Sequence, residues 1–182
     1  MSDTDGLTQH RIWHLGADID TDVLAPGHAM KHGIEVIAKH CLESVLPQFA
    51  REVRKGDVIV AGPNFGIGSS REQAAQVLVH LGIAAVIAPS YSGLYFRNAF
   101  NVGLLLLTCP QAELLHNQEL LTPDFKGPQV VLSDKTALKC EPIPEFLLQM
   151  VQAGGLLPSL KDRKSTRLNS SHVLRSRMPS SA

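Results

Sequence analysis

Short apolar runs alternate with amphipathic segments along most of this chain. Three runs, at 57–61, 84–88 and 103–108, are rich in β-branched or other apolar residues and lie close to glycine or proline. Runs of this length and composition predict buried strands. A further strand is expected at 10–15, where apolar and polar residues alternate.

Segments with helical spacing separate these strands. Residues 73–81 carry Ala74, Val77, Leu78 and Leu81 at intervals of three and four, which predicts a helix with Gly82 as its C-cap. Helices are also predicted at 34–46 before Pro47, at 91–101, at 110–117 with Pro110 in the first position, at 145–153, and, as a short helix or connector, at 48–54.

Strands that alternate with helices predict right-handed crossovers onto a largely parallel sheet. Residues 129–132 and 137–140 flank a polar segment and predict a hairpin. The expected fold class is therefore α/β, with a small mixed sheet flanked by helices. A length of 182 residues is enough for one domain with a sizeable core.

The most informative stretch joins the strand at 57–61 to the helix at 73–81. It reads Gly62-Pro63-Asn64-Phe65-Gly66-Ile67-Gly68-Ser69-Ser70-Arg71-Glu72. Gly66 and Gly68 permit a positive φ and a close approach of backbone to ligand. Ser69 with Glu72 three residues later fits a capping box, which predicts Ser69 at a helix N-terminus suited to an anion. The guanidinium of Arg71 can bind a carboxylate through two hydrogen bonds.

Three familiar motifs do not fit this stretch. A P-loop requires a lysine after its glycines, and none is present. The third glycine of a dinucleotide fingerprint would fall on Arg71, and neither Ser69 nor Ser70 has the glycine that a nucleophile elbow needs two residues later. Taken alone, the stretch is more typical of a plain helix cap than of a ligand site.

The longer string Asn64-Phe65-Gly66-x-Gly68-Ser69-Ser70-Arg71-Glu72 closely resembles the motif of the swivelling domain of the aconitase superfamily. The likeness is greatest to the separate small subunits of the 3-isopropylmalate dehydratases. Asp18-Ile19-Asp20-Thr21-Asp22 resembles an early segment of that family, and the segments at 82–104 and 146–157 resemble later ones. The resemblance covers roughly residues 10–160 and implies a swivelling β/β/α domain over 1–161.

The resemblance also implies an activity and roles for residues. The family isomerises hydroxy di- or tricarboxylic acids by removing water and adding it back in the other sense. It implies that Ser69 is the catalytic base and that Ser70 and Arg71 bind substrate carboxylates. Asp20, Thr21 and Asp22 are expected beside the active site, with Asn64, Gly66 and Gly68 in the same loop. A [4Fe–4S] cluster held by a large subunit is expected to act as the Lewis acid.

One loop departs from the family pattern and concerns the substrate. Where the small subunits often carry a Tyr-Leu pair, this chain has Ala29-Met30, followed by Lys31. Met30 can face an apolar substituent and Lys31 a carboxylate, although a solvated lysine is the commoner outcome. Both are predicted substrate-binding residues, and isopropylmalate is not the only substrate considered: citramalate, homoaconitate and dimethylmalate are alternatives.

No metal or cofactor site is expected in this chain itself. Cys41, Cys109 and Cys140 match no zinc or iron–sulfur spacing, and reduced, isolated thiols are the favoured interpretation. The three aspartates at 18–22 do not fit a calcium loop, because Val23 and Ala29 occupy the positions of the required glycine and glutamate. Asx turns and helix caps are the alternative role for these aspartates.

Residues 162–182 resemble the in-frame translation of a sequencing-library adapter, and they are predicted to be a non-native, disordered tail. This segment holds five of the 17 basic residues and one of the 17 acidic ones, which leaves 12 basic and 16 acidic residues and a net charge of −4. A nucleic-acid partner is therefore not expected. Without an 18-residue apolar run or an apolar leader at the N-terminus, the expectation is no membrane span and a cytoplasmic setting.

Two main functions remain open from the sequence, and the missing P-loop lysine and third glycine argue against a third, a nucleotide-binding domain. The first is the small subunit of a heteromeric hydro-lyase, inactive without a cluster-bearing large subunit. The second is a non-catalytic carboxylate-binding regulatory module, in which Ser69 only caps a helix and Arg71 holds a metabolite.

Overall fold

The computed structural model describes residues 9–116, 120–124, 129–132 and 134–161. The predicted non-native tail at 162–182 lies outside these residues, and the limits of the 1–161 domain remain a prediction. Within the described part of the chain, no helix has the length and hydrophobicity needed to cross a bilayer.

The described strands form one seven-stranded sheet in the order β4-β3-β2-β1-β5-β6-β7. The strands are β1 (His10–His14), β2 (Val58–Val60), β3 (Ala85–Ala88), β4 (Leu105–Thr108), β5 (Leu120–Asp124), β6 (Gln129–Leu132) and β7 (Ala137–Lys139). The helices are α1 (Thr21–Leu24), α2 (Ile34–His40), α3 (Phe49–Glu52), α4 (Gln73–His80), α5 (Gly93–Asn101) and α6 (Glu145–Gln152), with 3₁₀ turns η1 (Met30–His32) and η2 (Ala112–Leu115).

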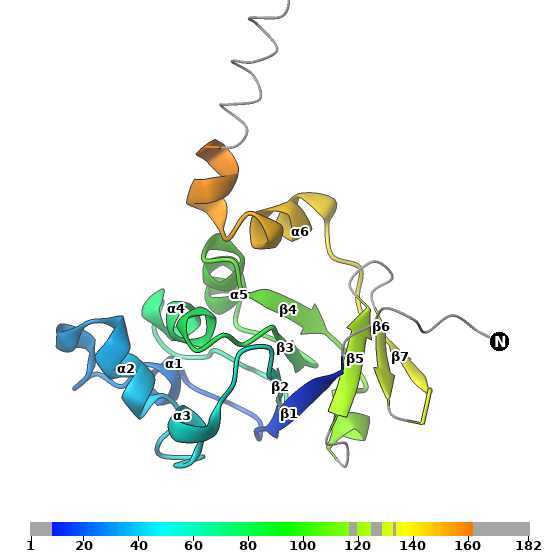
Figure 1. Cartoon of the computed structure of the whole chain (residues 1–182), viewed down its shortest axis with the longest axis horizontal. Helices are drawn as coiled ribbons and strands as arrows, with labels where there is room; N and C mark the ends of the chain where they lie inside the picture. Colours follow the sequence, from blue (N-terminus) through cyan, green and yellow to red (C-terminus); the bar gives the residue numbers. More distant parts are fainter. Residues whose placement is uncertain (1–8, 117–119, 125–128, 133, 162–182) are drawn as a thin grey trace, which may run out of the picture.

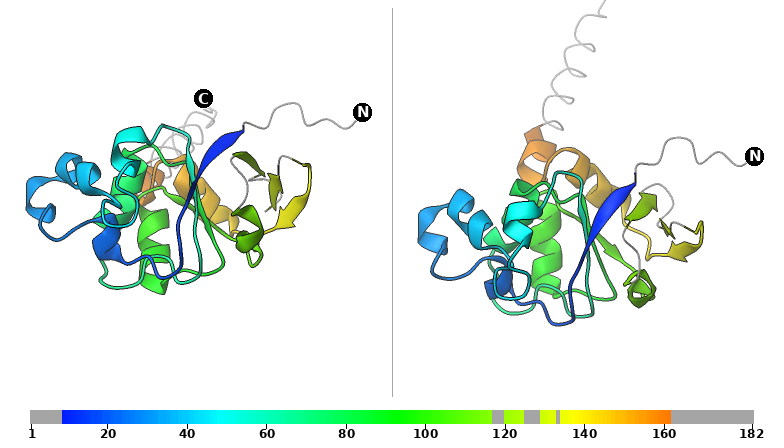
Figure 2. Two further views of the ribbon diagram at one scale, coloured as in Figure 1. Left: turned by 90° about the horizontal axis from the view of Figure 1, so that it is seen from below. Right: turned by 60° about the horizontal axis from the view of Figure 1, so that its bottom comes forward.

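The sheet is mixed, as predicted. Strands β1 to β4 pair in parallel, while β5, β6 and β7 continue the sheet in antiparallel pairing from β1. Every residue of β2 and β3 is buried, which explains why these strands are continuous apolar runs. Helices α2 and α3 lie at one end of the molecule and β6 and β7 at the other (Figures 1 and 2).

Several predicted elements are confirmed and others are corrected. Strands β1 to β4, the β6–β7 hairpin and helices α4, α5 and α6 lie within two residues of the predicted limits. The helix predicted at 34–46 ends at His40, because Leu42 takes a φ of 61° and its N–H bonds to Val23 O. The helix predicted at 110–117 is only the short turn η2, and β5 was not predicted.

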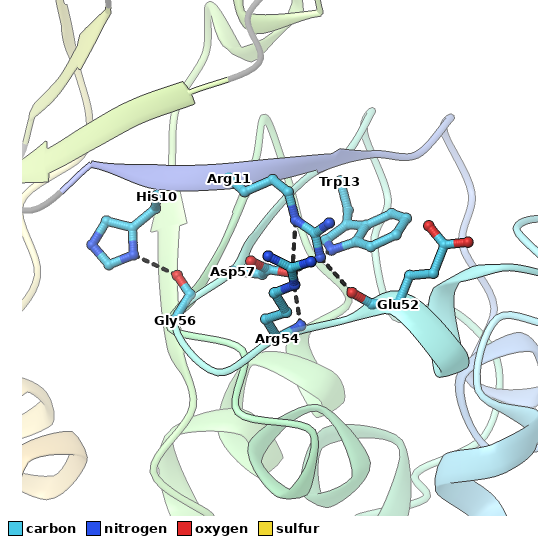
Figure 3. Close-up of polar contacts among 7 residues, drawn as sticks. All are labelled: His10, Arg11, Trp13, Glu52, Arg54, Gly56 and Asp57. Atoms are coloured by element: carbon cyan, nitrogen blue, oxygen red, sulfur yellow. Dashed lines mark hydrogen bonds and ion pairs between the residues drawn. The ribbon is translucent and has the colours of Figure 1, made fainter.

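A buried ion pair holds β1 to the turn that precedes β2. The carboxylate of Asp57, which is 4% exposed, accepts hydrogen bonds from Arg11 Nη2 at 2.6 Å, Trp13 Nε1 at 2.8 Å and the Arg54 N–H at 2.9 Å (Figure 3). Burial alone would raise the pKa of Asp57, but these donors outweigh it and lower the pKa below its ordinary value. The cluster lies at the amino ends of the parallel strands, so it stabilises the sheet from the edge opposite the loops described next.

Candidate active site at the carboxyl ends of the parallel strands

Apart from Met30 and Lys31, the predicted site residues lie on the segments that directly follow β1 and β2. In parallel sheets these loops meet at the carboxyl edge, where α/β proteins bind their ligands. The two loops run side by side in parallel, with a bridge between Asp20 and Ile67. Three backbone hydrogen bonds of 2.8–2.9 Å join them: Asp18 N–H to Pro63 O, Gly66 N–H to Ile19 O and Thr21 N–H to Ile67 O.

The two glycines of the loop are required by geometry. Gly66 has a φ of 78°, and a Cβ there would lie 2.1 Å from Cγ of the buried Tyr95 ring. Gly68 has a φ of 100°, and a Cβ there would lie 2.7 Å from both carboxylate oxygens of Asp20. The glycines therefore let the loop pack against α5 and against the start of α1.

Ser69 is placed by the buried hydroxyl of Thr21. The Ser69 N–H donates to Thr21 Oγ1 at 3.1 Å, and the two side-chain oxygens lie 3.3 Å apart, so either can donate to the other. Thr21 is 1% exposed, whereas Ser69 is exposed. The residue that the resemblance implies as the base is thus exposed and is held by a buried partner.

Arg71 and Ser70 are tied to different elements. Arg71 Nη1 pairs with the Asp22 carboxylate and donates to Ala25 O at 3.1 Å, which ties the loop to α1. Asn98 Nδ2 on α5 donates to Ser70 O at 3.2 Å. Both contacts of Arg71 use Nη1, and the guanidinium carries further donors on Nε and Nη2 that can bind a carboxylate.

The predicted capping box is wrong. Helix α4 begins at Gln73, and its N-cap is Glu72, which makes no side-chain cap. The reason is that Gly68 is left-handed and the Ser69 N–H bonds to Thr21, so the chain turns once more before the helix starts. Ser69 therefore lies ahead of the helix, and its polar partner is Thr21 in place of helix N–H groups.

Asn64 is the turn residue at the entrance of the loop. It takes a φ of 62°, its side chain donates to Asp18 Oδ1 at 2.8 Å, and its N–H donates to Ser90 Oγ at 2.9 Å. The part played by Ser90 and by Tyr95 was not predicted. A signal for Tyr95 existed, since it lies three residues before Asn98 on the same helix and so faces the same side.

Asp20, Thr21, Asp22, Ser69 and Arg71 are brought together, but Met30 and Lys31 are not joined to them. Both belong to η1, where Met30 packs partly buried against the core and Lys31 is exposed. Among the described residues, no hydrogen bond or ion pair links either side chain to Ser69, Ser70 or Arg71. Their assignment to the substrate remains a prediction.

The cysteines do not fit an iron–sulfur cluster. Cys41 is buried in the apolar core, and burial raises the pKa of its thiol. Cys140 donates a hydrogen bond to Cys109, which lowers the pKa of the Cys109 thiol to about 7. Over the ranges that the structure describes, the three thiols do not converge on a common point as cluster ligands must.

Comparison with known proteins identifies a family and a similar fold. The family model of the aconitase C-terminal domain matches residues 27–112. A crystal structure described as 3-isopropylmalate dehydratase from Methanocaldococcus jannaschii is similar in fold, with a TM-score of 0.81 and 34% identity over 89% of this chain and 98% of that one.

Curated relatives are similar over most of their lengths. The 3-isopropylmalate dehydratase small subunit 1 of Archaeoglobus fulgidus is 44% identical over 84% of this chain and 98% of that protein. The small subunit 1 of Thermotoga maritima is 37% identical over 87% and 98%. The methanogen homoaconitase small subunit of Methanothermobacter thermautotrophicus is 36% identical over 84% and 90%.

Proposed function

The chain belongs to the small-subunit family of the aconitase-type hydro-lyases, and from that premise we propose that it is the small subunit of an enzyme that isomerises 3-isopropylmalate and 2-isopropylmalate. The observation that carries the proposal is the contact between Ser69 and Thr21. They lie 48 residues apart in the sequence, in two motifs that resemble those of the family.

The chemistry requires a proton to leave a carbon next to a carboxylate. This step needs a positioned base and cationic or hydrogen-bonding groups on the carboxylate. We assign the base to Ser69 and the carboxylate contacts to Ser70 and Arg71. A serine hydroxyl is a weak base in water, so it needs a donor that stabilises its alkoxide. Thr21 Oγ1, 3.3 Å away, can supply that donor.

The rest of the active site is assigned to a second polypeptide. Because the cysteines of this chain do not fit a cluster, we propose that a large subunit carries the [4Fe–4S] group and closes over the exposed Ser69 loop. We also propose a cytoplasmic setting, which the three unpaired thiols support, since disulfides are rare there.

Reconstitution tests this function. The chain alone should be inactive towards 3-isopropylmalate, and activity should appear on adding a cluster-loaded large subunit from this family. Ser69→Ala should lower kcat about 10²- to 10⁴-fold, the usual contribution of a general base, without weakening subunit assembly. Ser44→Ala, at an exposed serine on another segment, is the matched control. A Ser69→Ala enzyme with near-normal kcat would contradict the base assignment.

A second substrate is favoured by one comparison. The homoaconitase relative and the exposed Lys31 both suit a substrate with a third carboxylate. A panel of 3-isopropylmalate, citramalate, dimethylmalate and homoaconitate, ranked by kcat/KM, decides between them. If the lone chain instead binds malate analogues in calorimetry and no large subunit confers activity, the regulatory-module alternative is correct.

A further inference from the structure

Two imidazoles and one carboxylate lie close together around α2. None of the three belongs to the Ser69–Thr21 contact. His28 lies in the loop before η1, His40 is the last residue of α2, and Glu43 lies in the turn that follows. Glu43 Oε2 is 2.7 Å from His40 Nδ1, and Glu43 Oε1 is 3.5 Å from His28 Nε2. The two rings meet edge to face, with centroids 4.9 Å apart.

We propose that His28, His40 and Glu43 bind a borderline divalent transition-metal ion, Zn²⁺ being the representative. One ligand atom from each residue lies within 4.8 Å of the other two. In a tetrahedral zinc site with bonds of about 2.0–2.1 Å, ligand atoms are about 3.3 Å apart. The His28–Glu43 separation of 3.5 Å is close to that value, and a bound metal would take the place of the 2.7 Å hydrogen bond between His40 Nδ1 and Glu43 Oε2.

The donor set selects the class of metal. Two imidazole nitrogens and one carboxylate oxygen suit Zn²⁺, Ni²⁺ and Cu²⁺, whereas Mg²⁺ and Ca²⁺ prefer oxygen ligands throughout. A fourth position is left for water, because the cluster is open to solvent: the His28 side chain is 62% exposed and that of Glu43 42%.

Metal binding here would act on the loop that carries Met30 and Lys31. His28 comes from that loop, while His40 and Glu43 come from the end of α2, so a bound ion links two segments that sheet hydrogen bonds do not join. The inference does not depend on the proposed reaction, because it concerns residues outside the Ser69–Arg71 cluster.

Titration of the full chain with ZnCl₂ tests the proposal. Calorimetry should show binding that His28→Ala and Glu43→Gln each weaken about a hundredfold, the rough share of one ligand in a zinc site. Co²⁺ should give the intense visible absorption of a tetrahedral site in the wild type but not in these variants, and MgCl₂ should give no heat. Zn²⁺ should also raise the Tm of the wild type.

His32→Ala is the matched control, since it removes an exposed histidine from the same loop but not from the cluster. It should keep the wild-type affinity. All variants replace exposed or half-exposed side chains, and circular dichroism checks that they fold. Absence of zinc binding by the wild type, or equal affinity in wild type, His28→Ala and Glu43→Gln, overturns the proposal.

Discussion

At the scale of single residues, Thr21 has the most constrained polar side chain of the candidate site. Its buried Oγ1 accepts the Ser69 N–H, lies 3.3 Å from Ser69 Oγ and lies 3.5 Å from Asp20 Oδ1. A buried hydroxyl with several partners is costly to remove, because each partner then loses a hydrogen bond. In the proposed reaction Thr21 is therefore a positioning residue, which acts on the substrate only through Ser69.

Replacing Thr21 separates positioning from folding. Thr21→Val keeps the shape but removes the hydroxyl, so we expect kcat of the reconstituted enzyme to fall about tenfold, the equivalent of one hydrogen bond of about 1.4 kcal/mol, with little change in KM. Thr21→Ser restores the oxygen and should recover most of the rate. Steady-state kinetics of both variants provide the measurement, and a Thr21→Val enzyme with unchanged kcat would show that this contact has no part in turnover.

Gly68 gives a second prediction at this scale. Gly68→Ala places a Cβ at a φ of 100° and 2.7 Å from the Asp20 carboxylate, so the loop must move. We expect a loss of about 1–3 kcal/mol in the free energy of unfolding, measured by urea denaturation, and a fall in kcat as Ser69 shifts. Gly93→Ala is the control, since nothing lies within 4 Å of its added Cβ; equal losses in the two variants would contradict the steric account.

At the scale of elements, the register of β1 on β2 depends on Asp57 as well as on the ladder. The pairing aligns Trp13 with Ile59, and both the Trp13 indole and the Arg11 guanidinium bond to the Asp57 carboxylate (Figure 3). The guanidinium carbon also lies 4.8 Å from the centroid of the Trp13 ring. These contacts thus hold β1 and β2 in register. The segments that follow these two strands carry Thr21 and Ser69.

The lowered pKa of Asp57 predicts a pH dependence. Because the folded protein holds this carboxylate ionised more strongly than the unfolded chain does, its stabilisation is complete above the ordinary aspartate pKa of about 3.9 and is lost as the pH falls below it. Asp57→Asn should cost about 2 kcal/mol at pH 7, a value reduced for the partial exposure of Arg11. Urea unfolding between pH 2.5 and 7 measures both effects.

The free energy of unfolding of Asp57→Asn should also fall less steeply in acid than that of the wild type, since the variant has no carboxylate to protonate at this position. Glu141→Gln is a suitable comparison, because this glutamate is exposed and takes no part in the Asp57 cluster. Wild-type steepness in the acid limb of Asp57→Asn would show that another group causes it.

Elements with strong local patterns were predictable, and those set by distant contacts were not. Strands β2 and β3 and helix α4 follow from apolar periodicity alone. The early end of α2 depends on the hydrogen bond from Leu42 to Val23, and the position of Ser69 ahead of α4 depends on its hydrogen bond to Thr21. β5 contains Pro123, which weakens any strand pattern. The site residues came from motif resemblance, but the Ser69–Thr21 contact required the fold.

At the scale of the whole molecule, the sheet has two unequal halves. The parallel strands β2 and β3 are buried throughout, whereas β6 alternates between buried and partly buried residues and β7 between exposed and buried ones. The antiparallel half joins the rest of the sheet through the pairing of β5 with β1, in which only His10 and Arg11 of β1 take part.

We therefore expect the two halves to open at different free energies. In native-state hydrogen exchange, amides of β6 and β7 should exchange through a lower-energy opening than amides of β2 and β3, because less apolar surface protects them. Exchange at equal free energy in all four strands would show instead that the sheet opens as one unit.

The backbone hydrogen bonds between the loops after β1 and β2 also bear on how such enzymes diversify. They give the Ser69 segment its shape within a single polypeptide, before any second subunit arrives. A segment of the proposed active site that is formed in advance can be exchanged between related assemblies without being rebuilt. Swapping small subunits among enzymes that share one large subunit should then transplant the preference for a substrate side group along with them.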